Sequence, residues 1–75
     1  MKLIDLPINT DAIITKIDCN EELKKRFYSF GIVRGAKIHI ENTSMTKNTI
    51  EVNVENTSIG LRIDEAKAIL VESQL

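Results

Sequence analysis

Strict alternation of apolar and polar residues recurs in the second half of this 75-residue chain. Around Ile38 and Ile40, every second residue is apolar and those between are polar or charged. A period of two predicts a β-strand with one face toward a core. Two shorter runs, β-branched or apolar, predict two more strands. The five predicted strands are residues 12–17, 36–41, 49–55, 58–63 and 68–72.

Short polar segments separate these strands and predict tight connections. We expect a polar loop at residues 42–48, and a hairpin turn at 55–58 because Asn56 tolerates a positive φ. A single helical turn capped by Asp64 is expected at 64–67. Five strands are too few for two packed sheets, and a closed barrel would leave no exposed edge. The expected fold class is therefore mainly β, a small closed barrel.

One amphipathic helix is predicted between the first two strands. Leu23, Phe27 and Phe30 fall at i, i+4 and i+7, which is one stripe of an α-helix. We expect Phe27 and Phe30 to lie in the core. Gly31 can supply the left-handed conformation that commonly closes a helix, and Gly35 opens the second strand. Both glycines are predicted to be structural.

The ends and the exposed face of this helix also carry signals. Asn20, or Asp18 two residues earlier, can accept hydrogen bonds from the amides of the first turn. Glu22 and Arg26 lie four residues apart with the acid first, the favourable order for an exposed helical ion pair. The helix must either cover the core of so small a chain or present a face to a partner.

The overall charge does not favour a nucleic acid or an anionic membrane as a partner. Ten basic and eleven acidic residues give a formal net charge of −1, and the only cysteine allows no internal disulfide. The chain has no apolar run long enough to span a membrane and no signal-peptide pattern at its start. We therefore expect a single cytoplasmic domain over residues 1–75, with no membrane insertion.

The sequence offers little material for catalysis or metal binding. Nucleophilic catalysis needs a nucleophile, a base and an orienting group, and a closed metal site needs three or four ligands. The one histidine, His39, is expected to point to solvent by alternation, and Cys19 to fill space beside the core. We predict a non-enzymatic protein with no catalytic residue, metal site or cofactor.

Nucleic-acid binding is a second hypothesis, because small barrels often bind single strands through aromatic residues on their strands. No predicted strand here carries an aromatic residue, and the pI is about 5.7. Basic residues near the helix end are better explained as a solvated surface. We therefore predict no nucleic-acid partner and keep RNA binding as the alternative. The basic residues in question are Lys24, Lys25, Arg26, Arg34 and Lys37.

Residues 25–35, KRFYSFGIVRG, resemble a signature of the FeoA family of bacterial ferrous iron transport. That signature is a helix with a basic residue and paired apolar residues, then Leu-Gly-Leu/Met, two residues and Gly. A second similarity runs from Leu61-Arg62 through Ala66 to residues 69–71. The chain departs from the family pattern in four ways. Arg34 stands where proline is common, Asn9 where glycine is common, and Phe27 and Phe30 where leucine is common.

The resemblance implies an SH3-like barrel of about five strands, with the helix inserted after the first strand. It also implies a cytoplasmic accessory role in ferrous iron uptake, with docking on the cytosolic part of the FeoB membrane transporter. The family is associated with transition metal ions, but the scarcity of ligands here fits a helper protein better than an iron carrier. We expect a monomer with at most weak self-association.

The predicted docking surface is the helix and the loop that follows it. Tyr28 lies off the apolar stripe, and interfaces favour Tyr and Arg as anchors. Arg62 could contact either a neighbouring carboxylate or a partner. Three alternatives stay open: RNA binding by the basic helix end, a regulatory contact with a different protein, and self-association through the helix face. The predicted partner-binding residues are Arg26, Tyr28, Val33, Arg34 and Arg62.

Overall fold

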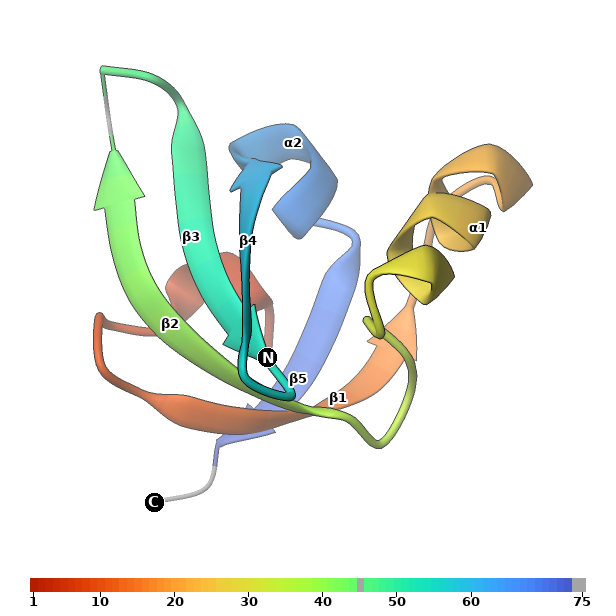
Figure 1. The fold of residues 1–75 in the computed structure, drawn as a ribbon, viewed down its shortest axis with the longest axis horizontal. Helices are drawn as coiled ribbons and strands as arrows, with labels where there is room; N and C mark the ends of the chain where they lie inside the picture. The colour runs from red at the N-terminus through yellow and green to blue at the C-terminus, as the bar shows by residue number, and fades with distance from the viewer. Residues whose placement is uncertain (45, 74–75) are drawn as a thin grey trace.

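The computed structural model describes residues 1–44 and 46–73 and folds them into one curved antiparallel sheet with two short helices (Figure 1). The sheet order is β4-β3-β2-β1-β5, and α1 lies between β1 and β2 in the chain, as predicted. The mainly β fold class is therefore confirmed. The elements are η1 (Leu3–Asp5), β1 (Asp11–Ile17), α1 (Glu21–Ser29), β2 (Lys37–Ser44), β3 (Thr49–Val54), β4 (Thr57–Arg62), α2 (Ile63–Ala66) and β5 (Ile69–Ser73).

The barrel is completed by α2 rather than by a strand ladder. In the described part of the chain, β4 and β5 are the two edge strands and do not pair with each other. The four-residue α2 connects them (Figure 1). Beyond β5, Lys2 bridges Leu70, and the Val71 N–H donates to the Met1 carbonyl at 2.8 Å. The expectation of full closure is thus wrong, because a helical turn and the N-terminal residues occupy that side.

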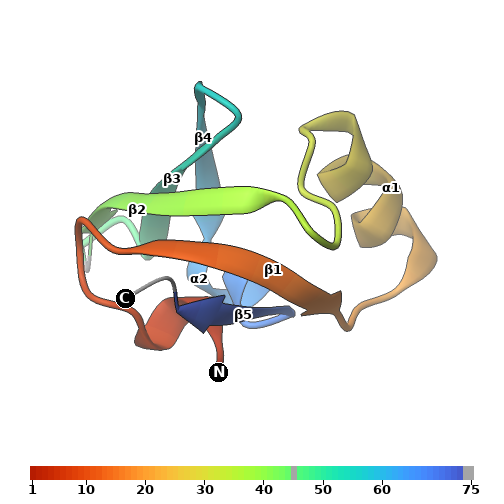
Figure 2. The same cartoon turned by 90° about the horizontal axis from the view of Figure 1, so that it is seen from below.

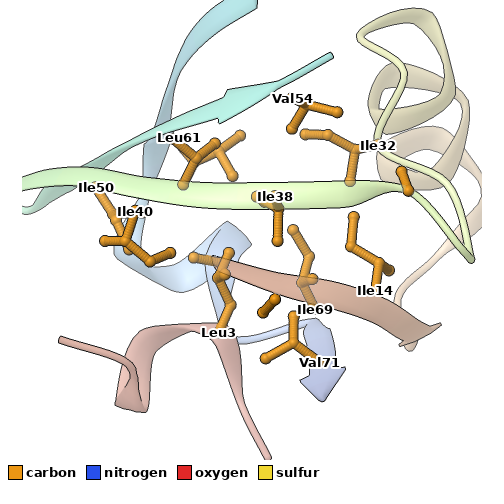
Figure 3. Packing of buried hydrophobic residues seen from close by; sticks show 14 of the residues in the cluster. Leu3, Ile14, Ile32, Ile38, Ile40, Ile50, Val54, Leu61, Ile69 and Val71 are labelled. Atoms are coloured by element: carbon orange, nitrogen blue, oxygen red, sulfur yellow. The ribbon is translucent and has the colours of Figure 1, made fainter. Parts of the chain in front are cut away.

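The alternating residues point into one core, as the period of two predicted. Ile38, Ile40 and Val52 are fully buried. Side chains from several strands of the curved sheet converge around Ile38 (Figure 3). Leu3 of η1 and Ile32 of the loop after α1 are equally buried. A core supplied by the strands, by η1 and by the loop after α1 holds the sheet in its curved form.

Several predicted boundaries differ from the structure by one to three residues, and two of these differences have a clear physical reason. Residues 42–44 continue β2 instead of starting a loop, because a register shift between Ile40 and Asn42 lets pairing with β3 resume beyond the break in alternation. The turn at α2 has Arg62, not Asp64, as its N-cap. The Arg62 N–H donates to Glu65 Oε1 at 3.0 Å, so the helix begins one residue earlier than predicted.

The ends of α1 are both capped, and its C-terminal end explains why Phe27 is buried and Phe30 is exposed. Asn20 caps the helix, with the Leu23 N–H donating to Asn20 Oδ1 at 2.9 Å. At the other end, Gly31 has φ +82°, and the Ile32 N–H donates to the Phe27 carbonyl at 2.9 Å. This pattern is a Schellman motif, and Ile32, like Phe27, is buried in the core.

The core prediction for Phe30 is wrong. Phe27 is 1% exposed, whereas Phe30, the C-cap residue, is 39% exposed. The helical stripe ends with the helix at Ser29, and Ile32 takes the core position that the periodicity assigned to Phe30. The predicted hairpin turn between β3 and β4 is confirmed: Glu55 and Asn56 both have positive φ there.

Candidate functional site

Exposed apolar side chains gather at the end of α1 and in the loop after it. Tyr28, Phe30 and Val33 are 53%, 39% and 38% exposed, and all three lie within residues 28–33. We call these three residues the apolar patch. Single exposed apolar residues are ordinary, but several in one short segment mark a contact surface. Sequence reasoning placed Tyr28 and Val33 on this surface and missed Phe30.

A shallow hollow of about 250 Å³ adjoins the patch at Tyr28. Its walls combine the end of β1, the helix α1 and the loop before β2, and three of its side chains are cationic. We call it the basic hollow. Of the predicted partner-binding residues, only Tyr28 and Arg34 line it. Its lining residues are Thr15, Lys16, Ile17, Lys24, Tyr28 and Arg34.

An irregularity in β1 brings Thr15 and Lys16 to the hollow together. In a regular strand, neighbouring side chains point to opposite faces. Here the register between β1 and β5 shifts between Ile14 and Lys16. Thr15 and Lys16 are both exposed, whereas Ile14 and Ile17 on either side are buried. A bulge therefore turns two consecutive polar side chains outward without disturbing the core.

A tight turn places Arg34 in the lining of the basic hollow. The Ala36 N–H donates to the Val33 carbonyl at 3.0 Å, and Gly35 has φ +90°. A positive φ at the third residue of such a turn defines type II, with Arg34 at the corner. The Gly35 N–H also donates to the Ile14 carbonyl at 2.7 Å, which fixes the turn to β1. Gly35 is structural, as predicted, and its turn orients Arg34.

The cations of the basic hollow have no carboxylate partner in the part of the chain that the structure describes. None of the four ion pairs found among those residues includes Lys16, Lys24 or Arg34. The lining of the hollow contains no acidic residue either. In a chain of net charge −1, this is a local concentration of uncompensated positive charge.

The outer face of β1, β2 and β3 has the opposite character. A hollow of about 540 Å³ there is lined by polar residues, three of which are acidic. His39 Nδ1 lies 2.7 Å from Asp11 Oδ1, and Lys37 Nζ lies 4.0 Å from Asp11 Oδ2. His39 is thus half-buried against Asp11 rather than simply solvated, a contact set by their direct opposition in the β1–β2 register. Lys37 and His39 therefore both lie beside the Asp11 carboxylate.

Arg26 faces away from the basic hollow. Its Nη1 donates to Glu65 Oε2 at 2.6 Å, and Glu65 Oε1 accepts from the Arg62 N–H. Glu65 therefore joins α1 to the start of α2, and no bond from Arg26 to Glu22 is found within the described residues. The Arg62 side chain is exposed on the last residue of β4. The sequence carried no signal for the pair, because its partners are 39 residues apart.

The cysteine is poorly suited to nucleophilic chemistry. Cys19 is partly buried against the core, as predicted. Burial raises the pKa of its thiol above the ordinary value; Lys24 opposes this, whereas Asp18 and Glu21 add to it. At neutral pH the less reactive thiol form is therefore favoured. Across residues 1–44 and 46–73, no three His, Cys, Asp or Glu side chains come together in a group that could hold a metal ion.

Comparison with known proteins shows the family of this chain. A sequence model of the FeoA domain matches residues 1–73. The chain belongs to the FeoA family. A putative Fe(2+) transport protein A from Campylobacter jejuni is 35% identical over 71 residues, which is 95% of this chain and 96% of that protein. The resemblance seen in the sequence is confirmed.

Solved FeoA structures share the fold. The solution structure of FeoA from Chlorobium tepidum has a TM-score of 0.93 at 29% identity, covering 100% of this chain and 71% of that one. The crystal structure of Stenotrophomonas maltophilia FeoA with zinc has a TM-score of 0.82 at 28% identity, covering 96% and 89%. That protein is described as a prokaryotic SH3 domain protein and a candidate activating factor for ferrous iron transport. The expected SH3-like architecture is thus confirmed for this FeoA protein.

None of the described helices of this FeoA protein has both the length and the apolar character needed to cross a membrane.

Proposed function

We propose that this FeoA protein is a non-catalytic accessory protein of ferrous iron uptake in the bacterial cytoplasm. It docks on the cytosolic part of an FeoB-type transporter through the apolar patch. The observation that carries the proposal is the exposure of Tyr28, Phe30 and Val33 at one end of α1. Membership of the FeoA family supplies the link to iron transport.

The patch has the composition of an interface anchor. The chain has three aromatic residues, and two of them, Tyr28 and Phe30, are exposed here while Phe27 fills the core. Aromatic side chains dominate interface energetics because each buries roughly 150–250 Å² of surface on contact. Tyr28 and Phe30 lie within the Schellman motif that ends α1, and Val33 follows it directly.

Binding of the purified protein to the cytosolic domain of an FeoB-type transporter, measured by calorimetry, tests the proposal. We expect Tyr28→Ala to weaken binding by roughly tenfold or more, the range of an interface hot spot. The melting temperature should hardly change, since Tyr28 is 53% exposed. Ile8→Ala is the matched control, because Ile8 is 46% exposed on a different segment. Repeating the titration with guanine nucleotide shows whether the contact depends on the state of the transporter.

Two outcomes would contradict the proposal. The first is absence of binding with and without nucleotide, which would remove the transporter domain as the partner. The second is equal weakening by Tyr28→Ala and Ile8→Ala, which would move the contact away from the apolar patch.

A further inference from the structure

We infer that the basic hollow binds a carboxylate side chain from an acidic segment of the docking partner. The partner's own apolar side chains would cover the adjacent apolar patch. The inference rests on the proposed docking function and adds the chemistry of the partner. Lys16, Lys24 and Arg34 supply the charge, and Tyr28 belongs to both the hollow and the patch.

The basic hollow brings together three cations that form no ion pair with a described residue. On the outer sheet face, Lys37 and His39 both lie beside the Asp11 carboxylate. Lys16 and Arg34 are exposed and Lys24 is half-buried, and none of them forms an ion pair with a described residue. Bringing three like charges around one hollow raises the free energy of the unbound protein. An incoming anion would relieve that repulsion.

Two local irregularities of the backbone build the hollow. The bulge in β1 turns Lys16 outward beside Thr15, and the type II turn at Gly35 places Arg34 at a corner fixed to Ile14. In a regular strand Lys16 need not line the hollow, and in an ordinary loop Arg34 need not line it either. Bulges often re-aim side chains beside functional sites, and a guanidinium fork can bind a carboxylate through two parallel hydrogen bonds.

The surroundings favour a protein segment over a nucleic acid. A polynucleotide needs a groove of positive charge that follows many phosphates, with aromatic residues for successive bases. Here the cations are confined to one hollow of about 250 Å³ that contains a single aromatic residue. The outer sheet face carries Asp11, Glu41 and Glu55 and would repel a longer polyanion. An apolar anchor with one adjacent charge is instead the ordinary pattern of a protein interface.

A peptide probe tests the hollow without the transporter. The probe is a short peptide with Glu and Asp beside Leu, and its control has Gln and Asn in their place. In NMR titrations, we expect the acidic peptide to shift the signals of Thr15, Lys16 and Tyr28, and the neutral peptide to shift them at least fivefold less. Equal shifts with both peptides, or shifts on the outer sheet face instead, would overturn the inference. So would stronger binding of a single-stranded RNA oligonucleotide at the same residues.

Charge reversal then tests the hollow in the docked complex. Arg34→Glu should weaken binding to the FeoB-type cytosolic domain at least tenfold more than Lys47→Glu, a control with the same charge change on an exposed residue outside the hollow. Lys24→Gln serves as a milder second variant, and unchanged melting temperatures establish that all three variants are folded. Carbodiimide coupling should also join Lys16 or Lys24 to a carboxylate of the partner.

The outcomes separate this inference from the proposed function. Normal wild-type binding with equal losses in Arg34→Glu and Lys47→Glu overturns the carboxylate contact and leaves the docking function standing. No wild-type binding, together with selective binding of the acidic peptide, overturns the transporter as partner and supports the chemistry of the hollow.

Discussion

At the scale of single residues, the end of α1 determines that Phe27 is buried in the core and that Phe30 is exposed on the surface. Phe27 is 1% exposed, whereas Phe30 is 39% exposed. Replacing a fully buried Phe by Ala costs about 3–5 kcal/mol, which approaches the whole stability of a small domain. We therefore expect Phe27→Leu to lower the free energy of unfolding by about 1 kcal/mol, and Phe30→Leu to change it by less than about 0.5 kcal/mol.

Equilibrium urea unfolding, followed by circular dichroism, measures this difference. Tyr28→Leu is the control, because Tyr28 is 53% exposed on the same helix. If Phe30→Leu proved as destabilising as Phe27→Leu, Phe30 would belong to the core in solution and the apolar patch would lose one of its three members.

Periodicity predicts the burial of Phe27 correctly and the burial of Phe30 incorrectly. A stripe at i, i+4 and i+7 assumes that the helix continues, and α1 ends at Ser29. Gly31 was recognised as a helix end, but its Schellman geometry, which gives the core position to Ile32, was not. The contact between Arg26 and Glu65 could not be predicted, because it depends on how α1 and α2 meet in space.

At the scale of secondary structure, the turn at residues 33–36 decides where Arg34 lies. The second position of a type II turn favours proline, whose ring fixes φ near −65°. Within the described residues, the Arg34 N–H donates no backbone hydrogen bond that a proline would remove. We expect Arg34→Pro to raise the free energy of unfolding by about 0.4–1 kcal/mol, because the unfolded chain loses conformational freedom.

Guanidinium unfolding measures that gain, with Arg34→Ala as the control that removes the same side chain and leaves φ free. Both variants should lose the contribution of Arg34 to partner binding equally. A loss of stability in Arg34→Pro alone would show that Arg34 does not occupy the second position of this turn.

The strands show the same division between predictable and unpredictable features. Alternation placed Ile38, Ile40 and Val52 in the core correctly, because a period of two fixes which face is buried. It ended the second strand too early at Asn42, where the period breaks, since a bulge depends on the partner strand. The irregularity after Ile14 in β1 likewise leaves no sign in the sequence pattern. The sequence does not predict that Lys16 lines the basic hollow, because it does not reveal this bulge.

At the scale of the whole molecule, α1 stands apart from the curved sheet (Figures 1 and 2). Phe27 is its only fully buried side chain, and Leu23 is only partly buried against the core. The ion pair between Arg26 and Glu65 adds one contact to α2, with Arg26 54% exposed. The proposed docking surface is therefore built on a weakly anchored element, while β2 and β3 belong to the continuous core.

This arrangement predicts that α1 opens locally without unfolding the sheet. Amide hydrogens in residues 25–28 should exchange faster than those of Ile38 and Val52, which require global unfolding. Glu65→Gln removes the charge of the pair with Arg26 and keeps a side-chain oxygen for the Arg62 N–H. A pair with one exposed partner contributes at most about 1 kcal/mol, so exchange in α1 should rise by up to about fivefold. Native-state exchange measured by NMR should show this rise in α1 and almost none in β2 and β3. Equal acceleration in α1 and the strands would mean that the helix unfolds only with the whole domain, and that the docking surface is as rigid as the core.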